Sequence, residues 1–161
     1  MPKSLYCTLL FVVSLCASTF GSQAYGGQAS VLLSMDRGGI NLGGDYQFSN
    51  AAESGAVFMR LYPKDEDELK PGVLVLGGGL RYVGGSRFMV FSATIGGSLM
   101  SVDTIADEEL LIGPSMAIAL RKRLGALSIG LEHLSAYSWF GDDALAGEVL
   151  RDTMLTLTFQ I

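Results

Sequence analysis

The sequence predicts an all-β protein: an eight-stranded antiparallel up-and-down transmembrane β-barrel that follows an N-terminal signal peptide. Apolar and polar residues alternate along eight segments, which is the period of a β-strand with one apolar face. Short and long connections alternate between these segments. After residue 24, no stretch reaches the ~18 consecutive apolar residues that a membrane helix needs. A chain that enters a membrane without such a helix must enter it as strands.

The composition favours one domain in an apolar environment. The chain has 161 residues, of which 49% are hydrophobic and 17% charged, and its mean hydropathy is +0.39. These values exclude a disordered chain and are high for a soluble domain. The length fits a single domain.

The first 24 residues have the pattern of a secretory signal peptide. Lys3 supplies the positive charge, residues 5–15 the apolar segment, and Ser22-Gln23-Ala24 the small-x-small cleavage site. We therefore expect a signal peptide over residues 1–24 and a barrel domain over 25–161, exported through the periplasm.

Both cysteines, Cys7 and Cys16, lie in the expected signal peptide, so the mature chain has no thiol or disulfide chemistry available. Lipidation at Cys16 is disfavoured because the bulky Leu15 precedes it. Cleavage removes Lys3 and no acid, so 11 basic residues become 10 against 16 acidic ones and the net charge changes from −5 to −6. That balance argues against nucleic acid as a partner.

The eight expected strands cover, in chain order, about residues 29–35, 40–49, 55–62, 73–83, 87–101, 110–121, 126–137 and 152–161. From the second strand onward each has an apolar face, formed by Ile40, Leu42, Tyr46, Phe48; Val57, Met59, Leu61; Leu74, Leu76, Leu80, Tyr82; Met89, Phe91, Ala93, Ile95, Leu99; Ile112, Met116, Ile118, Leu120; Leu127, Ile129, Leu131; and Leu155, Leu157, Phe159, Ile161.

The lengths of the connections predict the orientation of the barrel. Residues 50–54, 84–86 and 122–125 are short connections, whereas 63–72, 102–109 and 138–151 are long; the short first connection, 36–39, departs from the pattern. Short turns on one rim and long loops on the other are typical of bacterial outer-membrane barrels, with the turns in the periplasm.

The size of the polar residues predicts which face points inward. The polar face contains mostly glycine, serine, alanine and threonine, with no lysine and one glutamate. A water-exposed face normally has many long charged side chains, whereas small groups suit the narrow interior of an eight-stranded barrel. A soluble periplasmic barrel or sandwich remains the alternative.

Four charged residues lie on this inward face, namely Asp45, Arg60, Arg81 and Glu132. Buried charges persist when they are paired, so we expect these four to form a charge network in the lumen. Eight strands leave no open aqueous channel, which argues against a diffusion pore.

The interfacial aromatic residues and the last strand resemble those of known barrels. Tyr46, Phe48, Tyr82 and Phe159 lie near the turn-side strand ends, and Tyr137 and Trp139 near a loop-side end. The chain resembles the OmpA transmembrane domain and the YfaZ-like proteins over its whole mature part. The resemblance implies a monomer in outer-membrane lipid and lipopolysaccharide, inserted by the barrel-assembly machinery through Leu155, Leu157, Phe159 and Ile161, although the final residue is not aromatic.

Cofactor and metal motifs are weak. The chain has one histidine, and the glycines of residues 77–79 lie within a strand rather than before a helix, so they are expected to relieve crowding or permit a bend. The acidic runs at residues 65–68, 107–109 and 142–143 fit solvated loops better than calcium loops. The basic run 121–123 lies at an expected turn, either solvated or touching lipid phosphates. We expect no cofactor and no metal.

One group of residues has the chemistry of acyl transfer. His133 and Ser135 share the outward face in the outer-leaflet half of the apolar band, and Glu148 precedes the last expected strand. The spacing is similar to the His-x-Ser pair and later Glu of the lipid A 3-O-deacylases, over about residues 132–148. It departs at Ala136, where that family usually has asparagine. The alternative is that the pair has no catalytic role and lies at the membrane interface or at a β-bulge.

These observations predict an integral outer-membrane protein with a structural or surface-interaction role. The alternative is a hydrolase for lipid A acyl esters that uses Ser135, His133 and Glu148.

Overall fold

The computed structural model describes residues 26–49, 51–65, 70–103, 108–141 and 147–161. The expected signal peptide over residues 1–24 lies outside this part of the chain. No helix in the described ranges is long and apolar enough to span a membrane.

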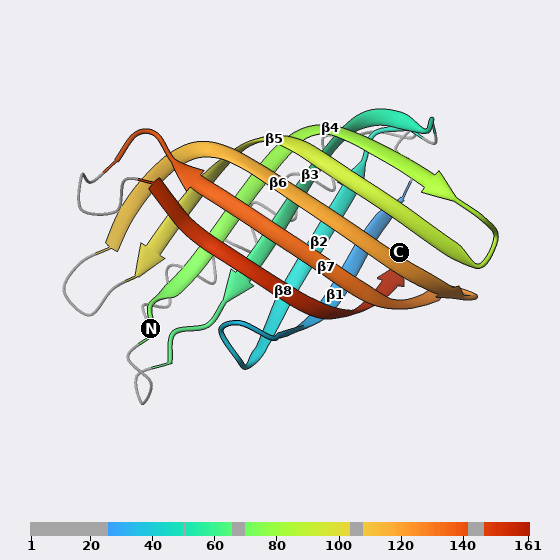
Figure 1. Ribbon diagram of the computed structural model, residues 1–161, viewed down its shortest axis with the longest axis horizontal. Helices are drawn as coiled ribbons and strands as arrows, with labels where there is room; N and C mark the ends of the chain where they lie inside the picture. The colour runs from blue at the N-terminus through green and yellow to red at the C-terminus, as the bar shows by residue number, and fades with distance from the viewer. Residues whose placement is uncertain (1–25, 50, 66–69, 104–107, 142–146) are drawn as a thin grey trace.

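Eight antiparallel strands close into a single barrel in which each strand pairs with its sequence neighbours and β1 pairs with β8. The strands cross the molecule side by side at a tilt (Figure 1). They are β1 (Gly27–Ser34), β2 (Ile40–Gln47), β3 (Glu53–Tyr62), β4 (Gly72–Gly85), β5 (Met89–Asp103), β6 (Glu108–Leu124), β7 (Leu127–Ser138) and β8 (Gly147–Gln160). The predicted fold class and strand count are therefore confirmed.

Two strands extend well beyond their predicted ends. Strand β8 begins at Gly147 instead of residue 152, and β6 ends at Leu124 instead of residue 121. The reason is pairing with β7: Leu124 lies opposite Leu127, and Gly147 lies opposite Ser138. Interstrand hydrogen bonds thus carry both strands past the point where the apolar alternation ends.

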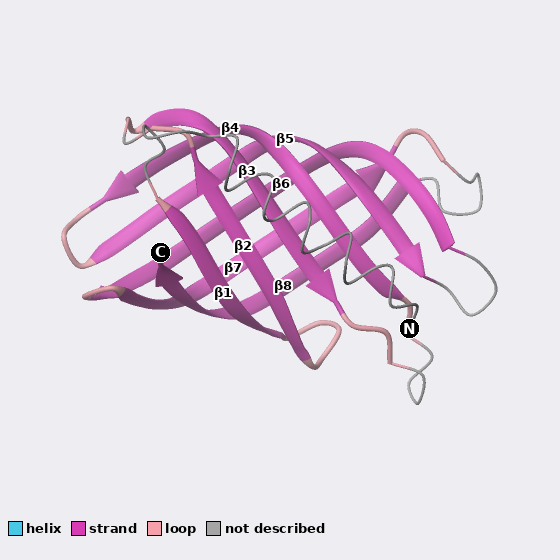
Figure 2. Ribbon diagram, turned by 180° about the vertical axis from the view of Figure 1, so that it is seen from behind, coloured by secondary structure: helices cyan, strands magenta, loops and turns pink. Residues whose placement is uncertain are grey.

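The connections divide between two rims. The ends at which β2 meets β3, β4 meets β5 and β6 meets β7 lie at the rim that also holds the C-terminus, here called the turn side, and the other strand ends lie at the opposite rim, the loop side (Figure 2). The turn between β6 and β7 has two residues, Gly125 and Ala126. Gly125 has φ +73°, a left-handed conformation that glycine adopts without steric cost.

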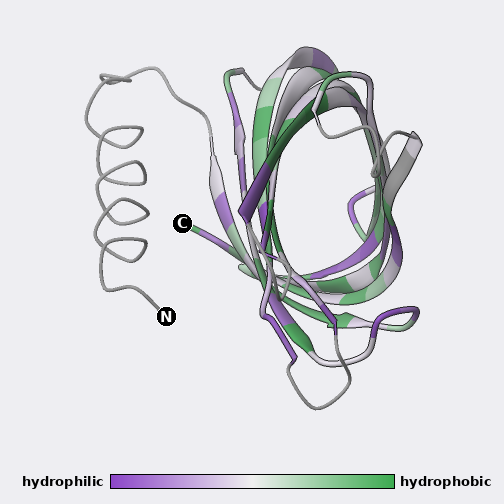
Figure 3. Cartoon of the chain, turned by 90° about the vertical axis from the view of Figure 1, so that its left-hand side faces the viewer, coloured by the Kyte–Doolittle hydropathy of each residue, from purple (hydrophilic) through white to green (hydrophobic). Residues whose placement is uncertain are grey.

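The outer surface of the barrel is apolar. Seen along the barrel, the strands form a closed ring (Figure 3). Large apolar side chains of every strand point away from the ring and are exposed, among them Leu33, Leu42, Val57, Leu80, Ile95, Ile112, Leu131 and Leu155. Among the expected interfacial aromatics, Tyr82, Phe159, Tyr137 and Trp139 are exposed. Such a surface is favourable in contact with lipid and unfavourable in contact with water.

Side chains fill the lumen, and its two halves differ in polarity. An apolar cluster that includes Leu32, Tyr62, Met100, Leu111 and Met154 occupies the loop-side half. This corrects the expectation of an inward face that is small and polar throughout, because long apolar side chains at the loop-side strand ends also point inward. The turn-side half holds most of the buried charged residues, whereas buried Asp152, which accepts a hydrogen bond from the Ser34 hydroxyl, lies at the loop side.

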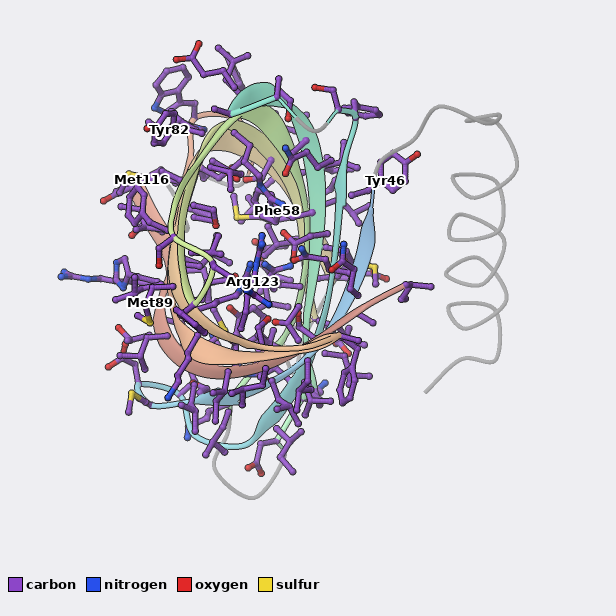
Figure 4. All side chains as sticks on the ribbon, turned by 90° about the vertical axis from the view of Figure 1, so that its right-hand side faces the viewer. Tyr46, Phe58, Tyr82, Met89, Met116 and Arg123 are labelled. Atoms are coloured by element: carbon purple, nitrogen blue, oxygen red, sulfur yellow. The ribbon has the colours of Figure 1, made fainter. Side chains whose placement is uncertain are left out.

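A glycine on β4 makes room for an aromatic ring in this lumen. A Cβ atom on Gly77 would lie 2.2 Å from the Phe58 ring of the neighbouring strand β3. Phe58 itself is 4% exposed, and its side chain lies inside the ring in Figure 4. The glycine of β4 thus relieves crowding where Phe58 fills the barrel.

Candidate functional site

Arg60 lies at the centre of a buried ion-pair network in the lumen. Its guanidinium nitrogen Nε donates to Oε1 of Glu132 at 2.7 Å, and its Nη2 donates to Oδ2 of Asp45 at 3.0 Å. The Nη1 atom donates to the backbone carbonyls of Gly44 and Met59. Strands β2, β3 and β7 are therefore joined across the barrel by one side chain that is 1% exposed.

Two further arginines complete the network. Arg81 on β4 pairs with Asp45 through Nη2, and its Nε donates to the Thr94 hydroxyl on β5 at 2.8 Å. Arg121 on β6 donates from Nη2 to Oε2 of Glu132 at 2.6 Å. Each carboxylate thus binds two guanidinium groups, which is the arrangement that offsets the cost of burying these charges.

The structure brings together the four lumen residues predicted from the sequence, Asp45, Arg60, Arg81 and Glu132. The fifth member, Arg121, was expected instead at a turn that is solvated or touches lipid. That assignment was wrong: Arg121 lies within β6 and is 7% exposed. The signal was present, because Arg121 continues the inward phase of Ala117 and Ala119.

The loop-side mouth of the barrel is hollowed. A cavity of about 470 Å³ lies there, and its lining includes Arg37, Tyr62, Lys64 and Lys70. The Arg37 guanidinium lies 5.5 Å from the centre of the Tyr62 ring and donates to the carbonyl of Pro71 at 2.7 Å. Lys64 forms an ion pair with Asp103 at 3.2 Å. This rim therefore presents several basic groups, held by contacts, to the loop-side exterior.

His133 and Ser135 are in contact on the outer face of β7. The ring nitrogen Nε2 of His133 lies 3.1 Å from the Ser135 hydroxyl, within hydrogen-bond distance. The other ring nitrogen, Nδ1, lies 3.1 Å from the Thr153 hydroxyl on β8, directly across the strand pair. Both ring nitrogens of His133 thus contact hydroxyl groups.

The neighbours of this pair place it on the outer face of the barrel. On β6, Met116 lies opposite Ser135, and Met116 lies outside the ring in Figure 4. The β7–β8 register shifts between Ala136 and Tyr137, beyond Ser135. The β-bulge therefore follows the pair and leaves it on the outward phase, where Ser135 is 6% exposed under its neighbours.

Two solved barrel structures are similar to this one. A crystal structure of Neisserial surface protein A (NspA) matches with a TM-score of 0.54 and 12% identity, covering 84% of this chain and 94% of that chain. Ail, the attachment invasion locus protein of Yersinia pestis, matches with a TM-score of 0.44 and 11% identity over the same shares. No protein-family model and no curated protein sequence matches the chain.

The chain has the fold of a small bacterial outer-membrane barrel. The structural similarity to NspA supports this assignment of the fold, and the apolar outer surface agrees with it. At 12% identity the likeness does not extend to a ligand or a role, so the function must be argued from the residues of this chain.

The third predicted catalytic residue, Glu148, lies within β8, not before it as predicted, because β8 pairs with β7 from Gly147 onward. Its backbone lies opposite Tyr137, and its side chain lies outside the described part of the structure. In the described part of the structure, His133 Nδ1 contacts the Thr153 hydroxyl. Sequence reasoning missed Thr153, because the register between β7 and β8 determines this contact.

A positive charge lies beside the histidine–serine pair. Arg151 on β8 lies opposite Ser135 in the strand register and is exposed. A guanidinium group at this depth would attract the phosphate or carbonyl oxygens of a lipid. Within the described ranges, no group of three or more His, Cys, Asp or Glu side chains has the geometry of a metal site.

Proposed function

We propose that the chain is an integral outer-membrane barrel with a structural or surface-interaction role, and that it conducts no solutes. One observation carries the proposal: the lumen is filled from the network around Arg60 to the apolar cluster at the loop side. A barrel of eight strands with such an interior has no room for a water column. The loop-side hollow lined by Arg37, Lys64, Lys70 and Asp65 is the surface we assign to interactions outside the cell.

Single-channel recording tests the absence of conduction. The protein is purified in detergent and reconstituted into planar lipid bilayers at 1 M KCl, a porin serving as the positive control. We expect no conductance steps from this barrel. Regular steps that persist after repurification would overturn the proposal, because they require an open path through the network.

A second function, hydrolysis of a lipid acyl ester, is favoured by the contact between His133 and Ser135. A hydroxyl within 3.1 Å of an imidazole nitrogen is the arrangement that activates a serine nucleophile. The histidine would take the hydroxyl proton as Ser135 attacks the ester carbonyl, and would return it to the leaving alcohol, so that the acyl chain is bound to Ser135. Water, deprotonated by the same histidine, would then attack the acyl-serine ester, release the fatty acid and return the proton to Ser135. The Thr153 hydroxyl would fix the ring, and Arg151 would stabilise negative charge on the substrate.

Mass spectrometry of lipid A tests this second function. Wild type, Ser135→Ala and Thr153→Val are expressed in a host with intact lipid A, and folded protein is quantified in each outer membrane. A deacylase predicts the loss of one hydroxyacyl chain with wild type and none with Ser135→Ala. Unchanged lipid A in cells that contain folded wild-type protein would exclude the hydrolase function and leave the structural or interaction role.

A further inference from the structure

We propose that the turn-side mouth of the lumen is a binding site for a phosphate group. The site lies below the ion-pair network, at the rim that holds the hairpin turns, and it is separate from the outer-face pair at His133. Two of its arginines, Arg121 and Arg123, come from the run 121–123, which alternates along the end of β6. Arg121 is buried and Lys122 is exposed, while Arg123 lies within the outline of the ring in Figure 4.

A cavity of about 290 Å³ opens at this mouth. Three arginines line it, Arg81, Arg121 and Arg123, together with the amide side chains of Gln28 and Gln47 and the hydroxyl of Ser92. These groups come from five strands and the cavity is large enough for a phosphate group with bound water. Gln28 accepts a hydrogen bond from Arg121 and the Gln47 amide donates to the Ser49 and Ala51 carbonyls, so the donors proposed to meet a ligand are the guanidinium nitrogens.

The charges around the cavity leave positive charge in excess. Arg60, Arg81 and Arg121 face two carboxylates in the network, Asp45 and Glu132. Both carboxylates already bind two guanidinium groups each. Arg123 adds a further positive charge at the mouth, and the described lining contains no acidic side chain. An anion would neutralise this excess.

One donor at the site has no acceptor. The Nε atom of Arg121 is buried and has no hydrogen-bond partner among the described residues, although the side chain pairs with Glu132 through Nη2. A buried donor left without a partner is unfavourable. This atom is not open to the cavity, so a phosphate would bind first to the exposed Arg123 guanidinium and would give Arg121 Nε an acceptor after a shift of the Arg121 side chain.

The ligand class follows from the donors. Guanidinium groups match the geometry of phosphate oxygens, and the half-enclosed site strengthens their attraction relative to bulk water. Either free phosphate or the headgroup of a phospholipid in the periplasmic leaflet presents this chemistry at the turn-side rim. The two sources differ in whether the ligand is anchored in the membrane.

Calorimetric titration of the full chain, purified from membranes into a non-ionic detergent, tests the site. The matched variants are Arg123→Gln and Lys122→Gln, which remove the same charge from neighbouring residues on opposite faces of β6. Neither residue takes part in the ion pairs of the network. We expect Arg123→Gln to weaken binding by about fivefold or more, the loss of one charge-assisted hydrogen bond, and Lys122→Gln by less than twofold.

Two probes distinguish the sources. Inorganic phosphate is titrated directly, and phosphatidylglycerol is titrated as mixed micelles with phosphatidylcholine micelles as the control. Binding of either probe that depends on Arg123 supports the site and identifies its source. The proposal is overturned if neither probe binds saturably, or if both variants lose affinity equally, since that result indicates a diffuse surface charge.

Discussion

Glu132 and Asp45 each accept hydrogen bonds from two guanidinium groups, and Arg60 is the residue that joins them. Arg60, Asp45 and Glu132 are at most 4% exposed, so each depends on the others for compensation of its lost hydration. Removing one member leaves its partners as unpaired buried charges. The network therefore acts as a unit that holds β2, β3, β4, β6 and β7 at fixed distances across the lumen.

Arg60→Ala is expected to lower the free energy of unfolding by about 3–5 kcal/mol, because it leaves Asp45 and Glu132 without their shared partner. Urea unfolding of the refolded barrel in detergent, followed by tryptophan fluorescence, measures the change. Arg87→Ala is the control, since Arg87 is exposed in the turn after β4. An Arg60→Ala midpoint equal to that of wild type would mean that the network contributes nothing to stability.

At the scale of the strand, packing between neighbours depends on glycines of the inward face. Gly77→Ala places a methyl group against the Phe58 ring, and such overpacking costs about 1–3 kcal/mol. The double variant Gly77→Ala, Phe58→Leu is expected to recover most of this loss, as measured by the same urea titration. Gly97→Ala is the control, because the atom nearest to its new Cβ lies 3.7 Å away. Equal stability of Gly77→Ala and Gly97→Ala would refute the packing argument.

The last strand carries a prediction about assembly. Phe159 is exposed on the outward face of β8, where the barrel-assembly machinery is expected to bind the alternating apolar residues. Phe159→Ser is expected to lower the amount of folded protein in the outer membrane several-fold, while refolding from urea into detergent proceeds as in wild type. Gln160→Ser is the control. Equal losses in cells and in detergent would assign Phe159 to stability instead of recognition.

Strand phase was predictable from the sequence, whereas register was not. The alternation of apolar residues within one strand shows which residues share a face. The outward face of Leu127, Ile129 and Leu131 could therefore be extended to His133 and Ser135. Contacts between strands depend on how far one strand slides along its neighbour, and no single strand encodes that offset. For this reason Thr153 was missed beside His133, and Glu148 was expected before β8 and not within it.

For the whole molecule, the division between turn side and loop side predicts which segments are accessible from outside the cell. An epitope tag inserted within residues 66–69 or 142–146 is expected to be tolerated, because longer surface loops cost little closure entropy. It should bind antibody on intact cells. A tag between Gly125 and Ala126 is the control and should bind only after the outer membrane is broken. The reverse pattern would invert the orientation proposed here.

The central claim is that the chain forms a closed barrel whose apolar outer face lies in lipid. Gel migration after refolding in detergent tests it most directly, because a closed barrel that resists dodecyl sulfate stays compact until it is boiled. We predict that unboiled protein from the outer-membrane fraction migrates faster than boiled protein, and that the difference persists in high salt. Identical migration of the two samples, with the protein recovered in the soluble periplasmic fraction, would contradict the account.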